Sequence, residues 1–265
     1  MTNIVWMSDL HFDHESSLLG HDTRVRLQAA IEHINQHHDD CQYCIISGDL
    51  VNQGSLTTYA ALSELLNTLK IPLLPMVGNH DNRQHVRSQF ALPDNCMNNF
   101  VQYSVPIENG LIVCLDTLKS GADSGELCRE RSEWLEHVLK SAGNTPVFLF
   151  MHHPPMALGL PMQDSDNLEQ GDQFLDLLAH HNNVKHLFIG HVHRRITGTI
   201  RGIPFATMSS VLFQAPAPRP HWSWDSFKPA SEAPNIGAIS IRNADVNLQY
   251  LQFCPYETGI ETDQG

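Results

Sequence analysis

The sequence predicts an α/β fold, and three observations support this prediction. Short apolar runs typical of buried strands alternate with segments whose apolar residues recur at helical spacing. The first three strand-like runs and the two helical segments between them have a β-α-β-α-β order, which favours parallel pairing beneath covering helices. Apolar residues make up 42% of the 265 residues, so the chain has enough apolar side chains for a large packed domain and is not a disordered one.

The first half of the chain supplies this alternation. A helix is expected over residues 23–37 and a second one around residues 59–69. Ser55 or Thr57 is the expected N-cap of the second helix, because a hydroxyl oxygen can accept a hydrogen bond from a first-turn N–H. The three strands are expected at residues 3–8, 43–47 and 73–77.

The second half adds a hairpin, two helices and further strands. Residues 108–110 (Glu-Asn-Gly) separate two short β runs and predict a hairpin turn. Residues 195–208 and 236–253 are β-rich, and between them lies a loop rich in Pro, Ser and Trp at 214–235. The other expected elements are strands at 101–106, 111–116, 146–151 and 186–190, and helices near 129–141 and 172–181.

Polar side chains that can bind metals follow the apolar strands. Taken singly, each is typical of a turn or a surface, but their repeated position after successive strands indicates one site where strand ends converge. Gly48 allows a tight turn just before Asp49, and His191 and His193 share one face of an extended segment. The seven candidate ligands are Asp9, His11, Asp49, Asn79, His152, His191 and His193.

Seven ligands exceed the four that one tetrahedral zinc ion takes. They suit two metal ions about 3.5–4 Å apart that share a bridging carboxylate, an arrangement used for in-line displacement at phosphorus. Because the set mixes nitrogen and oxygen atoms and contains no thiolate, we expect iron, manganese, zinc or cobalt. Water that bridges two such ions would ionise near neutral pH, and the hydroxide could attack a phosphate ester.

The segments around these candidate ligands resemble the motifs of a known family. The longer strings SDLH, GDLVNQG, GNHD, MHHPPMALGLPMQD and GHVH resemble the class III phosphodiesterase group, which holds cyclic-nucleotide phosphodiesterases and glycerophosphodiesterases. This group belongs to the calcineurin-like metallophosphoesterase superfamily. Over residues 9–193, the chain resembles the five ordered motifs of that superfamily: Asp9-x-His11, Gly48-Asp49, Gly78-Asn79-His80-Asp81, His152-x-Pro154 and Gly190-His191-x-His193.

The resemblance implies a four-layer α/β/β/α sandwich with a dimetal site at the carboxyl ends of its strands. It also implies that Asp49 bridges the two metal ions. By similarity, one metal is held by Asp9, His11, Asp49 and His193, and the other by Asp49, Asn79, His152 and His191.

Residues beside the ligands receive further roles from the same resemblance. His80 would contact the phosphate and protonate the leaving group as a general acid. Asn79 is a neutral ligand whose bond could loosen to admit a phosphate oxygen, so Asn79 and His80 are both expected to bind substrate. Asp81 would either orient His80 or cap the next helix, and His153 would lie beside or behind His152.

The remaining expectations concern organisation and surroundings. Residues 1–210 are expected to form the catalytic domain, and residues 211–265 to complete the sandwich and supply a substrate lip or a dimer arm. The net charge of −13 disfavours a nucleic acid polymer, whereas metal ions can reverse the local field for a small anion. We expect a homodimer in the cytoplasm, with reduced cysteines and no membrane span, because no apolar run is long enough for one.

We therefore expect a metal-dependent phosphodiesterase. Its substrate would be a small phosphodiester, either a 3′,5′-cyclic nucleotide such as cAMP or a glycerophosphodiester. The alternatives are a phosphomonoesterase, nucleotidase or protein phosphatase of the same superfamily, and a metal-binding scaffold protein. The scaffold is disfavoured because all seven ligand positions carry competent side chains. Four aromatic residues would stack on a nucleobase or form a dimer contact: Phe213, Trp222, Trp224 and Phe227.

Overall fold

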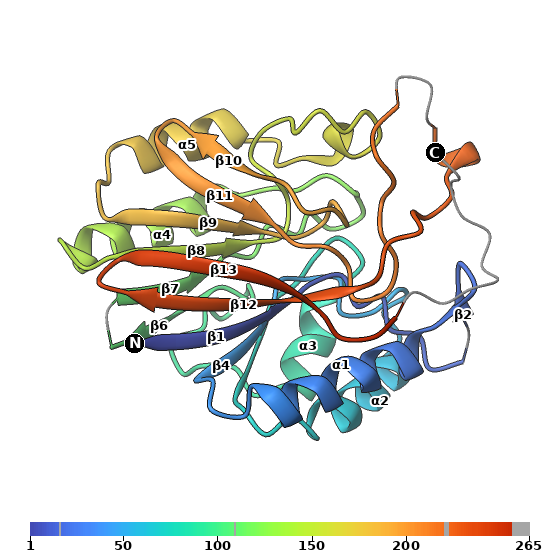
Figure 1. The fold of residues 1–265 in the computed structure, drawn as a ribbon. Coiled ribbons are helices and arrows are strands. Elements are labelled where there is room, and N and C mark those ends of the chain that lie inside the picture. The colour runs from blue at the N-terminus through green and yellow to red at the C-terminus, as the bar shows by residue number, and fades with distance from the viewer. Residues whose placement is uncertain (16, 109, 220–222, 256–265) are drawn as a thin grey trace.

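A computed structural model describes residues 1–15, 17–108, 110–219 and 223–255. Two β-sheets lie face to face, and helices cover the outer face of each sheet (Figure 1). The architecture is therefore the α/β/β/α sandwich that the family resemblance implies. Trp222, one of the four aromatic candidates, lies outside the described residues.

The first sheet has five strands in the order β13-β12-β1-β4-β5. β1 (Thr2–Met7), β4 (Tyr43–Ile46) and β5 (Leu73–Pro75) pair in parallel, as the β-α-β-α-β order predicts. On the other side of β1 lie the antiparallel strands β12 (Asn235–Arg242) and β13 (Asp245–Gln252). The carboxyl ends of the three parallel strands therefore share one edge of the sheet.

Helices α1 (Thr23–His37) and α2 (Leu56–Leu66) cover the outer face of this sheet (Figure 1). Of the two predicted caps, Ser55 is the N-cap of α2, because its hydroxyl accepts a hydrogen bond from the backbone N–H of Thr58 at 3.1 Å. Thr57 instead makes a side-chain hydrogen bond to Ser55 at 2.9 Å.

Several short elements were not predicted. A third helix, α3 (Arg83–Gln89), buries only Val86, so its sequence carries no clear helical periodicity. The other elements are too short for any periodicity to show. They are β2 (Ser17–Leu18), β3 (His21–Asp22) and the 3₁₀ turns η1 (Gln163–Asp166) and η2 (Trp224–Ser226).

The second sheet has six strands in the order β10-β11-β9-β8-β7-β6. Its four central strands are parallel: β11 (Ile203–Thr207), β9 (Val184–Ile189), β8 (Val147–Met151) and β7 (Gly110–Cys114). The antiparallel edge strands are β10 (Thr197–Ile200) and β6 (Tyr103–Ile107), and the β6–β7 pairing confirms the predicted hairpin. The outer helices are α4 (Arg129–Ala142) and α5 (Gly171–Ala179).

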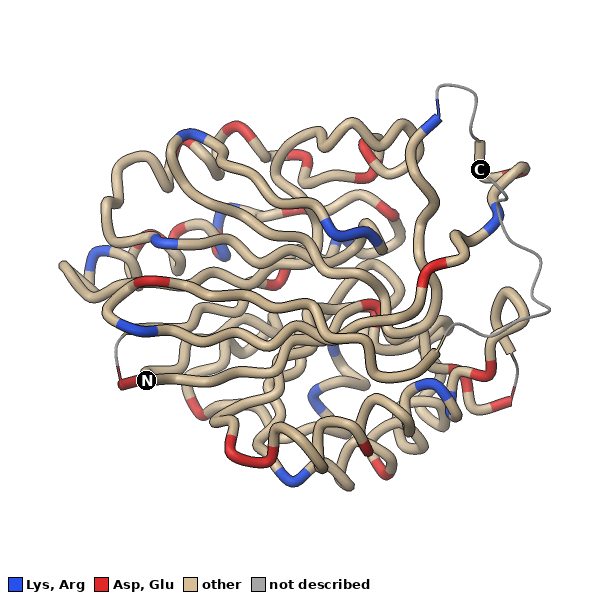
Figure 2. Tube along the Cα trace, viewed as in Figure 1, with Lys and Arg blue, Asp and Glu red and all other residues tan. Residues whose placement is uncertain are grey.

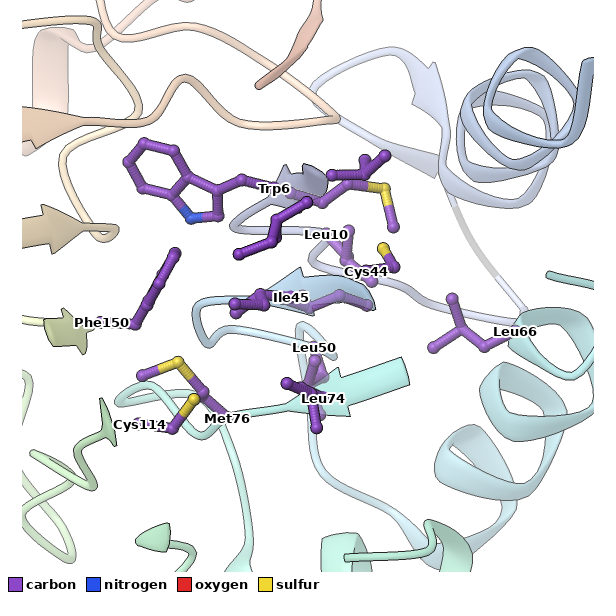
Figure 3. Close-up of a cluster of buried hydrophobic side chains, with 14 of the residues drawn as sticks. Trp6, Leu10, Cys44, Ile45, Leu50, Leu66, Leu74, Met76, Cys114 and Phe150 are labelled. Carbon is purple, nitrogen blue, oxygen red and sulfur yellow. The ribbon is translucent and has the colours of Figure 1, made fainter. Parts of the chain in front are cut away.

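Aromatic side chains join the two sheets. The Trp6 ring of β1 meets Phe150 of β8 edge to face, with centroids 6.0 Å apart, and Phe188 of β9 at 5.2 Å. Figure 3 shows Trp6 and Phe150 within the buried cluster. The indole N–H of Trp6 donates a hydrogen bond to the Ser47 hydroxyl at 2.9 Å. Because Ser47 directly follows β4, this bond connects the core to the loop after that strand.

Charged residues are scattered over the molecule. The chain has 16 Lys and Arg against 29 Asp and Glu, and Figure 2 shows the basic residues distributed among the acidic ones. This distribution offers a nucleic acid polymer little attraction. Within the described residues, no helix has the length and apolar content that crossing a membrane requires.

We predict that Trp6→Phe lowers the free energy of unfolding by about 1–3 kcal/mol, because it removes a buried hydrogen bond and leaves a small cavity. Urea denaturation measures this change. The matched control is Trp224→Phe, since Trp224 is 58% exposed and its substitution should alter stability by less than about 0.5 kcal/mol. Equal losses in the two variants would contradict the role given to Trp6.

Candidate metal centre

The predicted ligands meet at one edge of the sandwich, between the two sheets. Asp9 and His11 follow β1, Asp49 follows β4, Asn79 follows β5, His152 follows β8, and His191 and His193 follow β9. The loops from both sheets therefore contribute to one cluster. Groups of three His or Asp side chains from this cluster have potential ligand atoms within 4.8 Å of one another.

One half of the cluster contains Asp9, His11 and His193. Nε2 of His193 lies 3.4 Å from Oδ1 of Asp9 and 2.9 Å from Nε2 of His11. Oδ2 of Asp49 lies 3.6 Å from Nε2 of His11. Ligand atoms at about 2.0–2.2 Å from a shared metal are roughly 3 Å apart, so these spacings fit one coordination sphere.

The other half contains Asn79, His152 and His191. Oδ1 of Asn79 lies 3.2 Å from Nε2 of His152 and 3.2 Å from Nδ1 of His191. The same Oδ2 atom of Asp49 is 3.4 Å from Nε2 of His152. Asp49 thus lies next to a histidine from each half, which is the position that a bridging carboxylate needs.

Two backbone carbonyls orient the histidines of the cluster. Nδ1 of His193 lies 3.2 Å from the Phe213 carbonyl, and Nδ1 of His152 lies 2.8 Å from the Ser47 carbonyl. Because a carbonyl oxygen can only accept, each Nδ1 carries a proton, which leaves Nε2 as the ring atom available to a metal ion. Buried lone pairs together with carboxylates fit a divalent cation. The sequence had identified neither carbonyl.

The backbone of the ligand loops has a conformation that is rare for residues with side chains. Each such residue costs about 1–3 kcal/mol unless the surrounding structure holds it. Here the backbone N–H of His11 donates to the Asp49 carbonyl at 3.0 Å, which ties two of these loops together. Five of the seven candidate ligands have positive φ: Asp9 (53°), His11 (42°), Asp49 (50°), His191 (69°) and His193 (49°).

Two glycines allow the ligands to approach the backbone closely. Gly48 has a φ of 101°, as its predicted tight turn requires. Gly78 is needed for a different reason, because a Cβ atom there would lie 2.2 Å from Oδ1 of Asp49 and 2.6 Å from Nε2 of His152. A side chain at Gly78 would therefore displace Asp49 and His152.

Asp81 has neither of its two expected roles. Its carboxylate accepts hydrogen bonds from the backbone N–H of Gly78 at 2.9 Å, from that of Leu50 at 3.1 Å, and from the Tyr59 hydroxyl at 2.8 Å. The helix that follows is capped by Asn82 instead. Asp81 therefore joins the loop after β4 to the loop after β5.

His80 is oriented by a backbone carbonyl rather than by Asp81. Its Nδ1 lies 2.9 Å from the Asn52 carbonyl, so Nδ1 is the donor, while its backbone N–H donates to Oδ1 of Asp49 at 3.0 Å. Burial acts to lower the pKa of His80, but Asp49 and the Asn52 carbonyl outweigh it and raise this pKa above its ordinary value. The ring lines a cavity beside the cluster.

His153 supports the cluster from the side. Its ring centroid lies 4.8 Å from those of His152 and His191. Both of its nitrogens have other partners, since Nδ1 is 2.8 Å from the Thr117 hydroxyl and Nε2 is 3.1 Å from the Asp123 carbonyl. His153 is thus placed to position its neighbours.

The protonation of the cluster is set by burial and by mutual charge. Burial is the main cause that lowers the pKa of His11 and of His191 to about 3, so both rings are neutral. Burial also acts to lower the pKa of His152, but the Asp49 carboxylate raises it to about 9. A proton therefore competes with a metal ion for His152.

A cavity of about 330 Å³ opens beside the cluster. Five of the predicted ligands and His80 line it: His11, Asp49, Asn79, His191 and His193. The remainder of its lining comes from the segment between β7 and α4, from η1, from the segment between β11 and η2, and from η2 with the residue that follows it. These lining residues are Asp123, Gln163, Asp166, Phe213, Ala215, Trp224 and Phe227.

The chain is similar in sequence to a known family and to known proteins. The model of the calcineurin-like phosphoesterase family matches residues 2–195. A probable cyclic nucleotide phosphodiesterase of Rhodopseudomonas palustris is 38% identical over 214 residues, which cover 79% of this chain and 78% of the relative. A probable glycerophosphodiester phosphodiesterase of Arcobacter nitrofigilis is 32% identical over 218 residues, covering 80% and 79%.

The chain is similar to two further proteins, one in sequence and one in fold. The 3′,5′-cyclic adenosine monophosphate phosphodiesterase of Escherichia coli is 30% identical over 196 residues, covering 73% of this chain and 70% of that enzyme. The crystal structure of a dimetal phosphatase from Danio rerio superposes with a TM-score of 0.72 at 14% identity, covering 96% and 97% of the two chains. At this identity the second likeness concerns the fold.

We predict that the apparent affinity for manganese falls about tenfold per pH unit below pH 8, because His152 must lose its proton to bind a metal. Calorimetric titrations at pH 8, 7 and 6 measure the affinity. Repeating them in two buffers of different ionisation enthalpy counts the protons released. An affinity that does not change between pH 8 and pH 6 would contradict this competition.

Proposed function

The chain belongs to the calcineurin-like phosphoesterase family, and we propose that it is a dinuclear-metal phosphodiesterase that hydrolyses a small phosphodiester. The substrate is a 3′,5′-cyclic nucleotide such as cAMP, or a glycerophosphodiester, the classes named for its relatives. One observation carries the proposal: a single oxygen of Asp49 lies within 3.6 Å of histidines from both halves of the cluster.

The seven clustered side chains are the proposed ligands of two divalent ions, which are iron, manganese, zinc or cobalt. When bound, the two ions supply Lewis acidity toward the phosphate oxygens and lower the pKa of the attacking water. One metal is assigned to Asp9, His11, Asp49 and His193, and the other to Asp49, Asn79, His152 and His191.

Two residues of the chain are proposed to act on the substrate. The Asn79 amide is neutral, so it adds no negative charge where the phosphate must bind. His80 keeps Nδ1 bonded to the Asn52 carbonyl, so its second proton is carried on Nε2 and can be donated to the leaving alkoxide. Because the pKa of His80 is raised, a larger fraction of the rings carries this proton at neutral pH than in a free histidine.

The rest of the chain is assigned in the same proposal. We propose that the segment after residue 210 completes the catalytic unit; in support, its strand β12 pairs with β1, the strand that leads to Asp9 and His11. The homodimer and the cytoplasmic location stay predictions.

Paired ester assays test the proposed reaction. With manganese, zinc or cobalt added, we expect kcat/KM for bis-p-nitrophenyl phosphate to exceed that for p-nitrophenyl phosphate by about tenfold or more. An equally large preference for the monoester would favour the phosphatase or nucleotidase alternative. Hydrolysis of neither ester by metal-loaded protein would favour the scaffold alternative.

We predict that His80→Ala lowers kcat by about 10²–10⁴-fold while the metal content is retained, because His80 supplies a proton and not a ligand. The pH profile gives a second test. Activity of the unaltered enzyme should fall as pH rises through the raised pKa of His80, and this fall should be absent from the variant. His37→Ala, at an exposed position on α1, is the control. Loss of one metal equivalent from the His80 variant would contradict the assignment.

A further inference from the structure

The cavity beside the metal cluster has two features that phosphodiester hydrolysis leaves unused, a row of aromatic rings and an amide side chain. We propose that it binds a nucleobase, which stacks on Trp224 and Phe227 and hydrogen-bonds to Gln163. These residues would then select nucleotide diesters over glycerophosphodiesters. The inference rests on the proposed function and narrows its substrate class.

The aromatic rings form a continuous row that leads away from the ligands. The Phe213 ring lies 4.4 Å from that of His193 and 5.9 Å from that of Phe227, and Phe227 lies 5.7 Å from Trp224. Rings this close are in contact, so they form one aromatic surface along the cavity. Trp224 is 58% exposed, so much of its ring is available to a stacking partner.

Gln163 adds a polar side chain to the same lining. The residue is 8% exposed and lines the cavity, so its amide can meet a polar group of a ligand there. An amide offers one acceptor and two donors, which suits the edge of a nucleobase.

The turn that carries Gln163 is held in place. The carboxylate of the adjacent Asp164 accepts hydrogen bonds from the backbone N–H groups of Leu158 at 2.8 Å, Gly159 at 2.9 Å and Leu160 at 2.9 Å. These bonds fix η1 before any ligand arrives. Binding groups that are positioned in advance lose less entropy when the ligand is bound.

Two acidic residues in the same lining agree with a nucleobase. Asp123 and Asp166 line the cavity, and carboxylates there can accept hydrogen bonds from an exocyclic amino group. They also disfavour a second anionic group. A cationic head group such as choline would suit the carboxylates too, so phosphocholine belongs in the test.

Calorimetry on the metal-loaded full chain compares 5′-AMP with ribose 5-phosphate, which lacks only the base. We expect AMP to bind roughly 5–150-fold more tightly, the range of one base stacked on aromatic rings. Trp224→Ala should remove most of this difference, and Trp224→Phe should restore it. Gln163→Ala should reduce it by roughly 2–10-fold, whereas Gln249→Ala, at an exposed position on β13, should leave it unchanged.

Equal binding of AMP and ribose 5-phosphate, or no binding of AMP, would overturn the inference. So would an unchanged difference in Trp224→Ala, or phosphocholine bound more tightly than AMP. Because calorimetry needs no turnover, it separates the two claims. If the enzyme hydrolyses bis-p-nitrophenyl phosphate and shows no base contribution, only the inference fails. If it hydrolyses no ester, the proposed function fails whatever AMP does.

Discussion

The carboxylate of Asp49 is the group around which the site is arranged. Buried between two sheets, it would be unfavourable without partners, because a desolvated charge needs compensation. Its Oδ2 atom has His11 at 3.6 Å and His152 at 3.4 Å, and its Oδ1 atom accepts from the backbone N–H of His80. Burial tends to raise the pKa of Asp49, but these histidines hold it well below its ordinary value. Asp49 thus stays ionised between two groups of ligands.

The packing of the two sheets against each other holds the two groups of ligands in position. The Trp6 indole contacts rings of the opposite sheet and also donates to the Ser47 hydroxyl, while the Ser47 carbonyl accepts from Nδ1 of His152. Ser47 therefore contacts both the core residue Trp6 and His152, the candidate ligand that follows β8 of the other sheet. Its carbonyl fixes the tautomer of His152. The strained backbone of the ligand loops persists because such contacts leave it little freedom.

Much of this could be predicted from the sequence. Each apolar run is visible in the sequence, and so is the Asp, Asn or His that follows it. The fold class and the residues that cluster could therefore be predicted from the order of these motifs. The orienting groups on Ser47, Asn52 and Phe213 could not be foreseen, because they are backbone carbonyls and any residue type supplies one. The role of Asp81 was missed because its partners lie on two loops that only the folded chain brings together.

The most direct test of the shared carboxylate is a crystal structure of manganese-loaded protein with anomalous scattering. If Asp49 bridges two metal ions, two anomalous peaks lie about 3.5–4 Å apart, both within bonding distance of Asp49. Asn79 and His152 should contact one peak, and His11 and His193 the other. A single fully occupied peak, or two peaks of which only one contacts Asp49, would contradict the bridged arrangement.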